Sequence, residues 1–343
     1  MKRREFIALF GGAAAAWPLA ARAQQPAMQT IGVLRINPQG VAESFAEPFR
    51  RYMRALGWEE GRNVRFLFVW AAGQNERLPA LAQELVASGA DLIITFGDPG
   101  VKAAQEASAK IPVVGMTDDL VGSGAVASMA RPGGNTTGVS ILAPELDVKR
   151  LELLHVFVPQ ARRIGVLIDP SVTRDRSQLE QGGRALGIEL AMFDVRSHDE
   201  MPQALNAMIA SRVDAVNVLA SPLLNTARGL IIERLRAGRL PAIYQWPENA
   251  EEGGFLAYGP RQLLCYRHVA GLVDKVLRGA RPADLPGRTA GQVRAGAQSQ
   301  DRGRAWVDVL AAAFAPRRSG DRIATIEAGN GSILLSGSGR ASQ

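Results

Sequence analysis

The sequence predicts an α/β fold made of two doubly wound parallel-sheet lobes joined by crossovers. Strand-like and helix-like segments alternate along the 343 residues, and this pattern restarts about half-way along the chain. Several predicted strands are nearly continuous apolar runs, as expected where helices cover both faces of a sheet. Two such lobes form a cleft between them, and ligands of these sheets bind outside the carboxyl ends of the strands.

The N-terminal residues 1–23 are predicted to be an export signal of the twin-arginine type. The pair Arg3-Arg4 precedes an apolar, alanine-rich stretch over residues 8–20, and the Ala-Arg-Ala that ends at Ala23 offers the small residues a signal peptidase requires. The stretch is too short to span a bilayer stably, and no cysteine follows it to carry a lipid anchor. We expect cleavage after Ala23 and a periplasmic location, with an ordinary N-terminal helix as the alternative.

Residues 24–142 are predicted to form the first lobe. The predicted strands are 30–34, 63–70, 91–96 and 111–115, and the predicted helices are 45–56, 78–86 and 101–109. Gly57 is expected to cap the C-terminal end of the first of these helices. Residues 130–138 are rich in glycine and proline, so we interpret them as a turn or linker rather than as a strand or helix.

Residues 143–260 are predicted to form the second lobe, and residues 261–286 to carry a helix that returns to the first lobe. The predicted strands are 163–168, 188–195, 214–219, 241–245 and 254–258, and the predicted helices are 178–186, 201–210, 226–237 and 262–277. The two successive sets of strand–helix units imply two parallel sheets.

Polar side chains follow most of the predicted strands. They lie in the segments 35–37, 95–100, 117–119, 169–171, 221–222, 245–246 and 258–259. Asp98 is expected to cap a helix, with Pro99 in its first turn, where free backbone N–H groups make a seat for an anion. Each of these residues taken alone is more readily explained as a turn former than as a ligand contact. Their common position at strand ends predicts a ligand site in the cleft.

The sequence argues against several other functions. It has neither a Gly-x-Ser-x-Gly nucleophile elbow nor a phosphate-binding loop, and the adjacent Asp118 and Asp119 would point in opposite directions at a strand end. Cys265 is the only cysteine, so no intramolecular disulfide forms, and the three histidines are too far apart in the sequence to suggest a metal site. The net charge of +7 comes without a basic helix bearing interleaved aromatics, so we expect no nucleic-acid partner and no cofactor.

Four segments carry a resemblance to a known family. They are Gly-Trp-Glu-Glu-Gly-Arg-Asn-Val at 57–64, Val-Gly-Ser-Gly at 121–124 followed by Ala-Arg-Pro-Gly-Gly-Asn-Thr-Thr-Gly at 130–138, Pro-Ala-Ile-Tyr at 241–244, and Gly-Gly-Phe-Leu-Ala-Tyr-Gly-Pro at 253–260. With the export segment, they resemble the ABC transporter substrate-binding proteins related to the tryptophan/tyrosine-type uptake binding proteins. The resemblance runs from the start of the chain to Pro286.

The resemblance implies a two-lobed periplasmic-binding-protein fold of type I with three crossovers. It implies a non-enzymatic, monomeric protein that binds a small organic solute, amino-acid-like or aromatic, by hinge closure and delivers it to an ABC permease in the inner membrane. By resemblance, the ligand contacts fall at Asn37, Thr95, Asp98, Asp119, Ser221, Tyr244 and Tyr258. The chain departs from the family at residues 119–121, where many relatives have Asp-Pro-Val and this chain has Asp-Leu-Val.

The amino-acid composition changes after Pro286, and residues 287–343 contain no lysine. Relatives continue with Val-Glu-Gln-Pro-x-Lys-Phe-Glu-Leu-Val. Residues 287–296, written as GGT CGA ACA GCC GGT CAA GTT CGA GCT GGT, give that string once the first base is dropped and a suitable codon follows. We therefore predict a frameshift after Pro286 and a tail over 287–343 that is out of frame and disordered.

Two other classes remain open from the residues alone. A twin-arginine-exported periplasmic enzyme of α/β fold is the main alternative, since that route often carries cofactor-loaded enzymes, and the missing catalytic motifs weigh against it. A ligand-sensing domain like those of repressors is the other, and the export signal and the lack of a DNA-binding head weigh against it.

Overall fold

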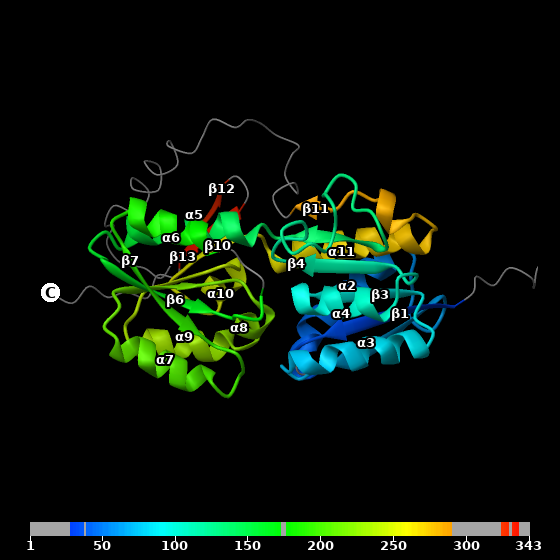
Figure 1. The fold of residues 1–343 in the computed structure, drawn as a ribbon, viewed down its shortest axis with the longest axis horizontal. Coiled ribbons are helices and arrows are strands. Elements are labelled where there is room, and N and C mark those ends of the chain that lie inside the picture. The colour runs from blue at the N-terminus through cyan, green and yellow to red at the C-terminus, as the bar shows by residue number, and fades with distance from the viewer. Residues whose placement is uncertain (1–27, 38, 173–175, 290–323, 329–330, 336–343) are drawn as a thin grey trace, which may run out of the picture.

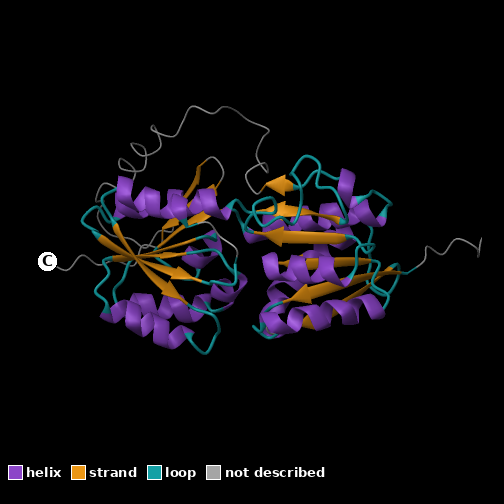
Figure 2. Ribbon diagram, in the orientation of Figure 1, coloured by secondary structure: helices purple, strands orange, loops and turns teal. Residues whose placement is uncertain are grey.

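The computed structural model describes residues 28–37, 39–172, 176–289, 324–328 and 331–335. The predicted export signal lies outside these residues. Two α/β lobes lie side by side (Figure 1), and in each a twisted sheet is sandwiched between layers of helices (Figure 2). The predicted fold class is confirmed.

The first lobe is built on a six-stranded sheet in the order β11-β5-β4-β3-β1-β2, all of whose neighbouring strands are parallel. The strands are β1 (Gln29–Arg35), β2 (Val64–Trp70), β3 (Leu92–Phe96), β4 (Val113–Thr117), β5 (Thr136–Ser140) and β11 (Arg288–Thr289). The order reverses beside β1, because the chain passes from β1 to β2 on one side and then to β3 on the other. Such a switch point opens a crevice at the carboxyl ends of the strands.

Helices cover both faces of this sheet. One face packs against α2 (Gln39–Ala55) and α11 (Gln262–Leu277), and the other packs against α3 (Leu78–Ala87) and α4 (Asp98–Ala107). The alternation of side chains along β1 explains how one strand serves both layers, since Val33 packs in the α2–α11 core and Leu34 in the α3–α4 core. This is why the predicted strands read as continuous apolar runs. Two short 3₁₀ helices, Asn75–Arg77 and Pro282–Asp284, complete the lobe.

The second lobe has a seven-stranded sheet in the order β12-β13-β10-β9-β8-β6-β7. The strands are β6 (Arg163–Ile168), β7 (Glu189–Asp194), β8 (Ala215–Val218), β9 (Ala242–Tyr244), β10 (Leu256–Gly259), β12 (Ala324–Ala328) and β13 (Gly331–Leu335). The strands from β6 to β10 are parallel, whereas β13 is antiparallel to both β10 and β12.

The helices of the second lobe also form two layers. The helices are α5 (Ala143–Phe157), α6 (Ser177–Ala185), α7 (Met201–Ala210), α8 (Pro222–Thr226), α9 (Arg228–Ala237) and α10 (Pro247–Glu251). Helices α5 and α6 share one core with the sheet, while residues of α7 to α10 lie in the other. Each lobe therefore has cores on both faces of its sheet and needs no disulfide, and the single cysteine, Cys265, is buried and free.

Within the described residues the chain passes between the lobes after β5 and after β10, and β12 and β13 of the second sheet follow β11 of the first sheet in the sequence. After β10 it returns through α11, which packs on α2, β4 and β5 of the first lobe. The interpretation of residues 130–138 as a linker is wrong at its end, because Thr136–Ser140 forms strand β5, which is buried along its whole length. Gly138 lies opposite Gly115 on β4, and this close backbone approach explains a glycine inside a central strand.

The tail also differs from its expected disorder at three described places. Residues 288–289 form β11 beside β5, and residues 324–328 and 331–335 form a hairpin that adds to the second sheet. The physical reason is that β10 would otherwise be an edge strand, with its backbone N–H and C=O groups unpaired. Strand β13 pairs with these groups.

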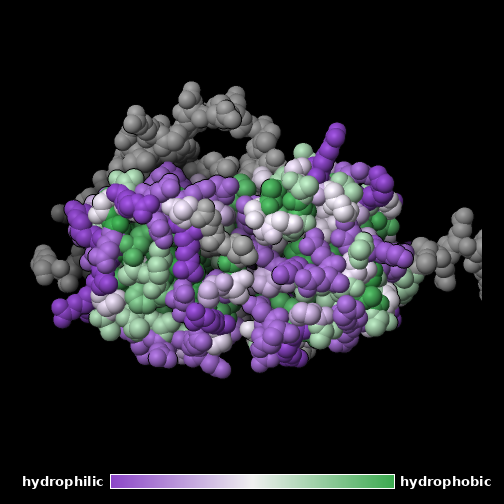
Figure 3. All heavy atoms as spheres, viewed as in Figure 1, coloured by the Kyte–Doolittle hydropathy of each residue, from purple (hydrophilic) through white to green (hydrophobic). Residues whose placement is uncertain are grey.

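No helix among the described residues is long and apolar enough to cross a membrane. Hydrophilic residues cover much of the face shown in Figure 3, and apolar residues gather there in separate patches on the two lobes.

Candidate functional site

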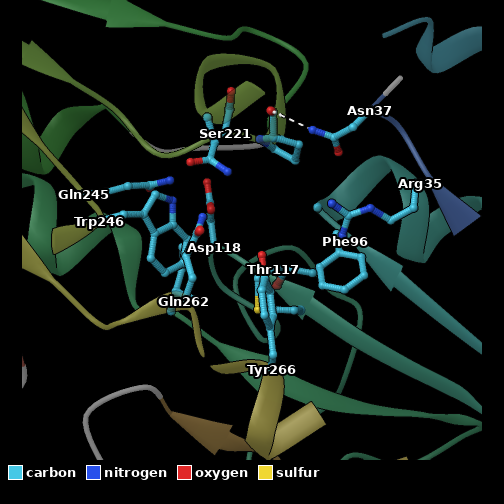
Figure 4. Close-up of a pocket in the computed structure, with 15 residues that line it drawn as sticks. Arg35, Asn37, Phe96, Thr117, Asp118, Ser221, Gln245, Trp246, Gln262 and Tyr266 are labelled. Atoms are coloured by element: carbon cyan, nitrogen blue, oxygen red, sulfur yellow. Dashed lines mark hydrogen bonds between the residues drawn. The ribbon is translucent and has the colours of Figure 1, made fainter. Parts of the chain in front are cut away.

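A cavity lies between the two lobes, at the carboxyl ends of strands from both sheets. It is lined by Arg35, Asn37, Phe96, Gly97, Met116, Thr117, Asp118, Ile141, Ser221, Pro222, Asn225, Gln245, Trp246, Gln262 and Tyr266. Figure 4 shows these side chains converging from the two lobes. The volume is about 50 Å³, which is room for a few water molecules.

Arg35 is the cation of this cavity. It is the last residue of β1, so the sheet carries it to the crevice, and only 6% of its surface is exposed. Its guanidinium lies over two rings, with the Arg35 Cζ atom 4.1 Å from the centroid of Phe96 and 5.1 Å from that of Phe45. Burial lowers the pKa of the guanidinium below its usual value. Its Nε has no hydrogen-bond partner among the described residues.

Thr117 and Asp118 bring polar oxygens to the cavity from the end of β4. Both side chains are buried, and the Oγ1 of Thr117 has no partner in the described part of the chain. The backbone carbonyl of Asp118 accepts a hydrogen bond from the Ala143 N–H (3.1 Å), which fixes this strand end against the start of α5. Asp119 turns away into the next loop, where its Oδ1 accepts from the N–H of Val121 (3.1 Å). The expected divergence of the two carboxylates is therefore seen.

Three aromatic side chains form apolar walls of the cavity. Phe96 ends β3, Tyr266 lies on α11 and Trp246 follows β9 in the second lobe. The rings of Phe96 and Tyr266 are perpendicular, with centroids 6.2 Å apart. Burial raises the pKa of Tyr266 to about 12, so its hydroxyl stays protonated at neutral pH. Such walls suit a planar or apolar part of a solute.

The second lobe adds hydrogen-bonding groups. The Gln245 Oε1 and the Trp246 Nε1 are buried without partners among the described residues. Gly259 on β10 allows the segment after β9 that carries them to lie close by, because a Cβ at Gly259 would be 1.9 Å from the Gln245 carbonyl oxygen. Ser221 also lines the cavity, but its Oγ accepts from the Leu224 N–H (2.9 Å) as the N-cap of α8.

The lobes touch at the rim of the cavity. The Asn37 side-chain Nδ2 donates to the carbonyl oxygen of Pro222 (3.4 Å) and to the Oγ1 of Thr226, both in the second lobe. Gly97 lies against Pro222, since a Cβ at Gly97 would be 3.0 Å from the Pro222 Cγ. The cleft is therefore closed in this structure.

The structure brings two of the seven predicted contact residues, Asn37 and Ser221, to the cavity. The other five, Thr95, Asp98, Asp119, Tyr244 and Tyr258, are absent from its lining. Four of these five are buried elsewhere in the lobes, and Asp119 holds its loop.

Asp98 also differs from its expected role as a helix cap. Gly97, with a φ of 77°, is the N-cap residue of α4, and Asp98 occupies the first helical position. The positive φ requires a glycine at this turn, and no side chain there is needed for the cap.

The transfer of contacts by resemblance missed Arg35, Asp118, Gln245 and Trp246. A signal for them was present, because all four lie in the polar segments that follow predicted strands. Gln262 and Tyr266 carry no such signal, since they come from the helix α11, which reaches the cavity only through the return of the chain to the first lobe.

The described residues hold no cluster of three or more His, Cys, Asp or Glu side chains able to bind a metal.

The model of the family described as ABC transporter substrate binding protein matches residues 43–295. This chain belongs to that family. The substrate-binding proteins of ABC transporters bind ligands and are not enzymes. Residues 296–343 lie beyond the match.

Known proteins similar to this substrate-binding protein agree with its fold. A tyrosine-binding protein of Clostridioides difficile (strain R20291) is 24% identical over 264 residues, which is 75% of each chain. The structure of an ABC domain in complex with L-Trp from Streptococcus pneumonia is 24% identical with a TM-score of 0.69, covering 77% of this chain and 89% of that one. A conserved domain protein from Vibrio cholerae is 22% identical with a TM-score of 0.70, covering 81% and 98%.

Proposed function

We propose that this protein is the periplasmic solute-binding component of an ABC importer. It binds a small organic solute, amino-acid-like or aromatic, in the interlobe cavity, and the two lobes close around it by a hinge motion. The observation that carries this proposal is the cavity itself. Both lobes contribute its lining, and polar groups that have no partner among the described residues line it beside aromatic rings.

The closed contact between the lobes supports the hinge motion. The contacts of Asn37 and Gly97 join the two lobes at the rim of a cavity of about 50 Å³, so these contacts separate when the lobes open for an organic solute. Only the chain connections after β5, β10 and β11 link the lobes covalently, which leaves rigid-body rotation as the simplest motion.

The chemistry of the walls supports an aromatic or amino-acid-like solute. Phe96, Trp246 and Tyr266 offer ring faces, and Arg35 and Asp118 place both signs of charge in one cavity. The similar proteins named for tyrosine and L-Trp point to the same class of solute. The permease partner, the monomeric state and the exported location are part of the proposal. Family membership supports the permease partner, and the predicted signal over residues 1–23 supports the exported location.

A binding experiment tests the solute. The purified protein is titrated calorimetrically with L-tryptophan, L-tyrosine, L-phenylalanine, purines and aromatic acids, and its melting temperature is followed in parallel. A ligand at 100 times its Kd is expected to add about 2.7 kcal/mol to the free energy of unfolding. Turnover of a bound compound into product would instead favour the alternative, an exported enzyme.

A fractionation experiment tests the location. When the full sequence is expressed, the protein is expected in the periplasmic fraction, cleaved after Ala23 so that Gln24 is its first residue. Replacement of Arg3 and Arg4 by lysine is expected to stop export by the twin-arginine route. Export that survives this replacement would point to the general secretory route.

The frameshift after Pro286 is also retained as a proposal. The family match ends at residue 295, close to the change in amino-acid composition after Pro286, and this supports the frameshift. Sequencing the gene is the direct test, since codons incompatible with the shifted string would exclude it. A chain with the frame restored is expected to unfold at a higher temperature than this one, because the family's own last strand and helix would return.

A further inference from the structure

We propose that Arg35 binds a carboxylate of the solute, so that this protein selects small organic acids, amino acids included, over neutral compounds of the same shape. The inference rests on the proposed function and deepens it by naming the group that anchors the solute. Arg35 is not among the contacts that the family resemblance implies.

The first step of the argument is that Arg35 is a buried cation without a counter-ion. With 6% of its surface exposed, it has lost most of its hydration. Among the described residues it forms no ion pair, and its Nε has no acceptor. A charge buried in this way is costly unless it is paired and hydrogen-bonded. The missing partner is therefore an anion that comes with the ligand.

The second step is that the guanidinium is already held in place. The Phe96 ring lies 4.1 Å from the Arg35 Cζ atom and the Phe45 ring 5.1 Å from it. Aromatic faces attract the flat face of a guanidinium and leave the N–H groups at its edge free to donate. Figure 4 shows Arg35 above Phe96, reaching toward the centre of the cavity. A carboxylate binds such an edge with two parallel hydrogen bonds.

The third step concerns Asp118, the other charged group of the lining. Asp118 interacts elsewhere and forms no ion pair with Arg35 among the described residues, although both line the same cavity. The two charges therefore do not neutralise each other directly. A solute carboxylate therefore pairs with Arg35 without displacing a protein carboxylate among the described residues.

Two other hydrogen-bond donors of the cavity that have no partner among the described residues also favour an anionic acceptor group. The Trp246 Nε1 and the Thr117 Oγ1 are buried, line the same cavity and have no partner among the described residues. A carboxylate has about four lone-pair sites, so it can accept from the Arg35 edge and from a neighbouring donor together. A neutral amide has only one such oxygen and adds an N–H₂ group that faces these donors unfavourably.

The test uses matched acids and amides. Wild-type protein and the Arg35→Gln, Arg35→Lys and Arg62→Gln variants are titrated with L-tryptophan and L-tryptophanamide, with L-tyrosine and L-tyrosinamide, and with 3-phenylpropionate and 3-phenylpropionamide. Arg62 is the control, since its side chain is 76% exposed and it lies outside the cavity.

The expected result is that the wild type binds one or more of the acids about 100-fold more tightly than the matching amide. Arg35→Gln is expected to remove that preference by lowering the affinity for the acid alone. Arg35→Lys is expected to keep part of it, because lysine keeps the positive charge but lacks the two parallel N–H donors of the guanidinium. Arg62→Gln is expected to leave both affinities unchanged. Equal weakening of acid and amide in Arg35→Gln would overturn the inference, as would equal binding of acid and amide by the wild type. Both outcomes leave the proposed function standing, whereas a wild type that binds no acid, amide or purine contradicts both.

A second measurement separates ligand binding from a structural role. Without ligand, Arg35→Gln is expected to melt at the same temperature as the wild type or higher, because it removes an unpaired buried charge. If Arg35 served only to pack against Phe45 and Phe96, the ligand-free variant would melt lower and its preference for acids would be unchanged.

Discussion

The Asn37 side chain of the first lobe donates a hydrogen bond across the cleft to the backbone carbonyl of Pro222 in the second lobe, at 3.4 Å. The same Nδ2 group also donates to the Thr226 Oγ1. These bonds exist only while the lobes are together, so they favour the closed state and not the stability of either lobe.

Replacing Asn37 by alanine is therefore expected to weaken solute binding about tenfold, the effect of losing roughly 1.4 kcal/mol of closed-state stabilisation. Titration calorimetry measures the change, and the melting temperature without ligand checks that the lobes remain folded. Thr226→Ser, which keeps the hydroxyl acceptor, is the control. An unchanged affinity in Asn37→Ala would show that the bond does not contribute to closure.

Gly97→Ala is expected to hinder closure through a steric contact. The added methyl group would lie 3.0 Å from the Pro222 Cγ of the other lobe, and Gly97 has a φ of 77°. Gly124 is the matched control, because its φ of 74° brings a similar backbone strain with no atom within 4 Å. Both alanine variants are expected to lose about 1 kcal/mol of unfolding free energy, but only Gly97→Ala should weaken solute binding. Equal affinities in the two variants would contradict the prediction.

Gly138→Ala is expected to destabilise the first lobe by about 3 kcal/mol, measured by urea unfolding. A Cβ there would lie 1.9 Å from the Gly115 carbonyl oxygen, so β4 and β5 would have to separate. Gly229→Ala on α9 is the control, since nothing lies within 4 Å of its Cβ position and the change is expected to be neutral or stabilising by about 0.5 kcal/mol. A small loss of unfolding free energy in Gly138→Ala would contradict this prediction, because it would mean that β4 and β5 separate at little cost.

Solute affinity is expected to fall as the pH is lowered below about 6.5, the usual pKa of histidine. His198 of the second lobe lies against Gly73 of the first, and burial lowers the pKa of His198 despite the opposing effect of Asp199. The closed state therefore prefers the neutral ring. Above the usual pKa the ring is neutral in both states and has no effect, and as the pH falls toward the lowered pKa, protonation favours the open state.

Titrations between pH 8 and pH 5 measure this dependence in the wild type and in two variants. His198→Gln is expected to remove this part of the pH dependence. His268→Gln is expected to keep it, because His268 also has a pKa lowered by burial but lies on α11 away from the cavity lining. A pH profile that is the same in all three proteins would exclude His198 as its source.

The strand–helix alternation was readable from the sequence because both sheets are covered on both faces. Strands such as β3 are five consecutive buried residues, and their short length, β-branched content and flanking turn residues distinguish them from buried helices. Strand β5 was missed because its glycine and the preceding Gly-Gly pair indicate a turn. Only the approach of Gly138 to Gly115, a contact between distant residues, makes it a strand.

The site was readable to the extent that it follows local rules. Arg35, Asp118 and Trp246 lie at or within two residues of the carboxyl ends of strands, so the rule for parallel sheets points to them without any comparison. Tyr266 belongs to a helix that is distant in the sequence, and no local pattern places it opposite Phe96. Residues carried over by resemblance, such as Tyr244, fit the pattern of the family but lie in the core of the second lobe here.

The pairing of β13 with β10 has a consequence for the order in which the protein folds. Leu335 lies opposite Leu256, so the second sheet takes its outer strands from segments that are synthesised well after β10. Contacts between residues so far apart in sequence form slowly, since a long loop must close, at a cost in entropy, before these contacts contribute any stabilising free energy. The first lobe can assemble most of its sheet during synthesis, whereas the second must wait with β10 uncovered, and this interval is when the nascent chain is most exposed to aggregation.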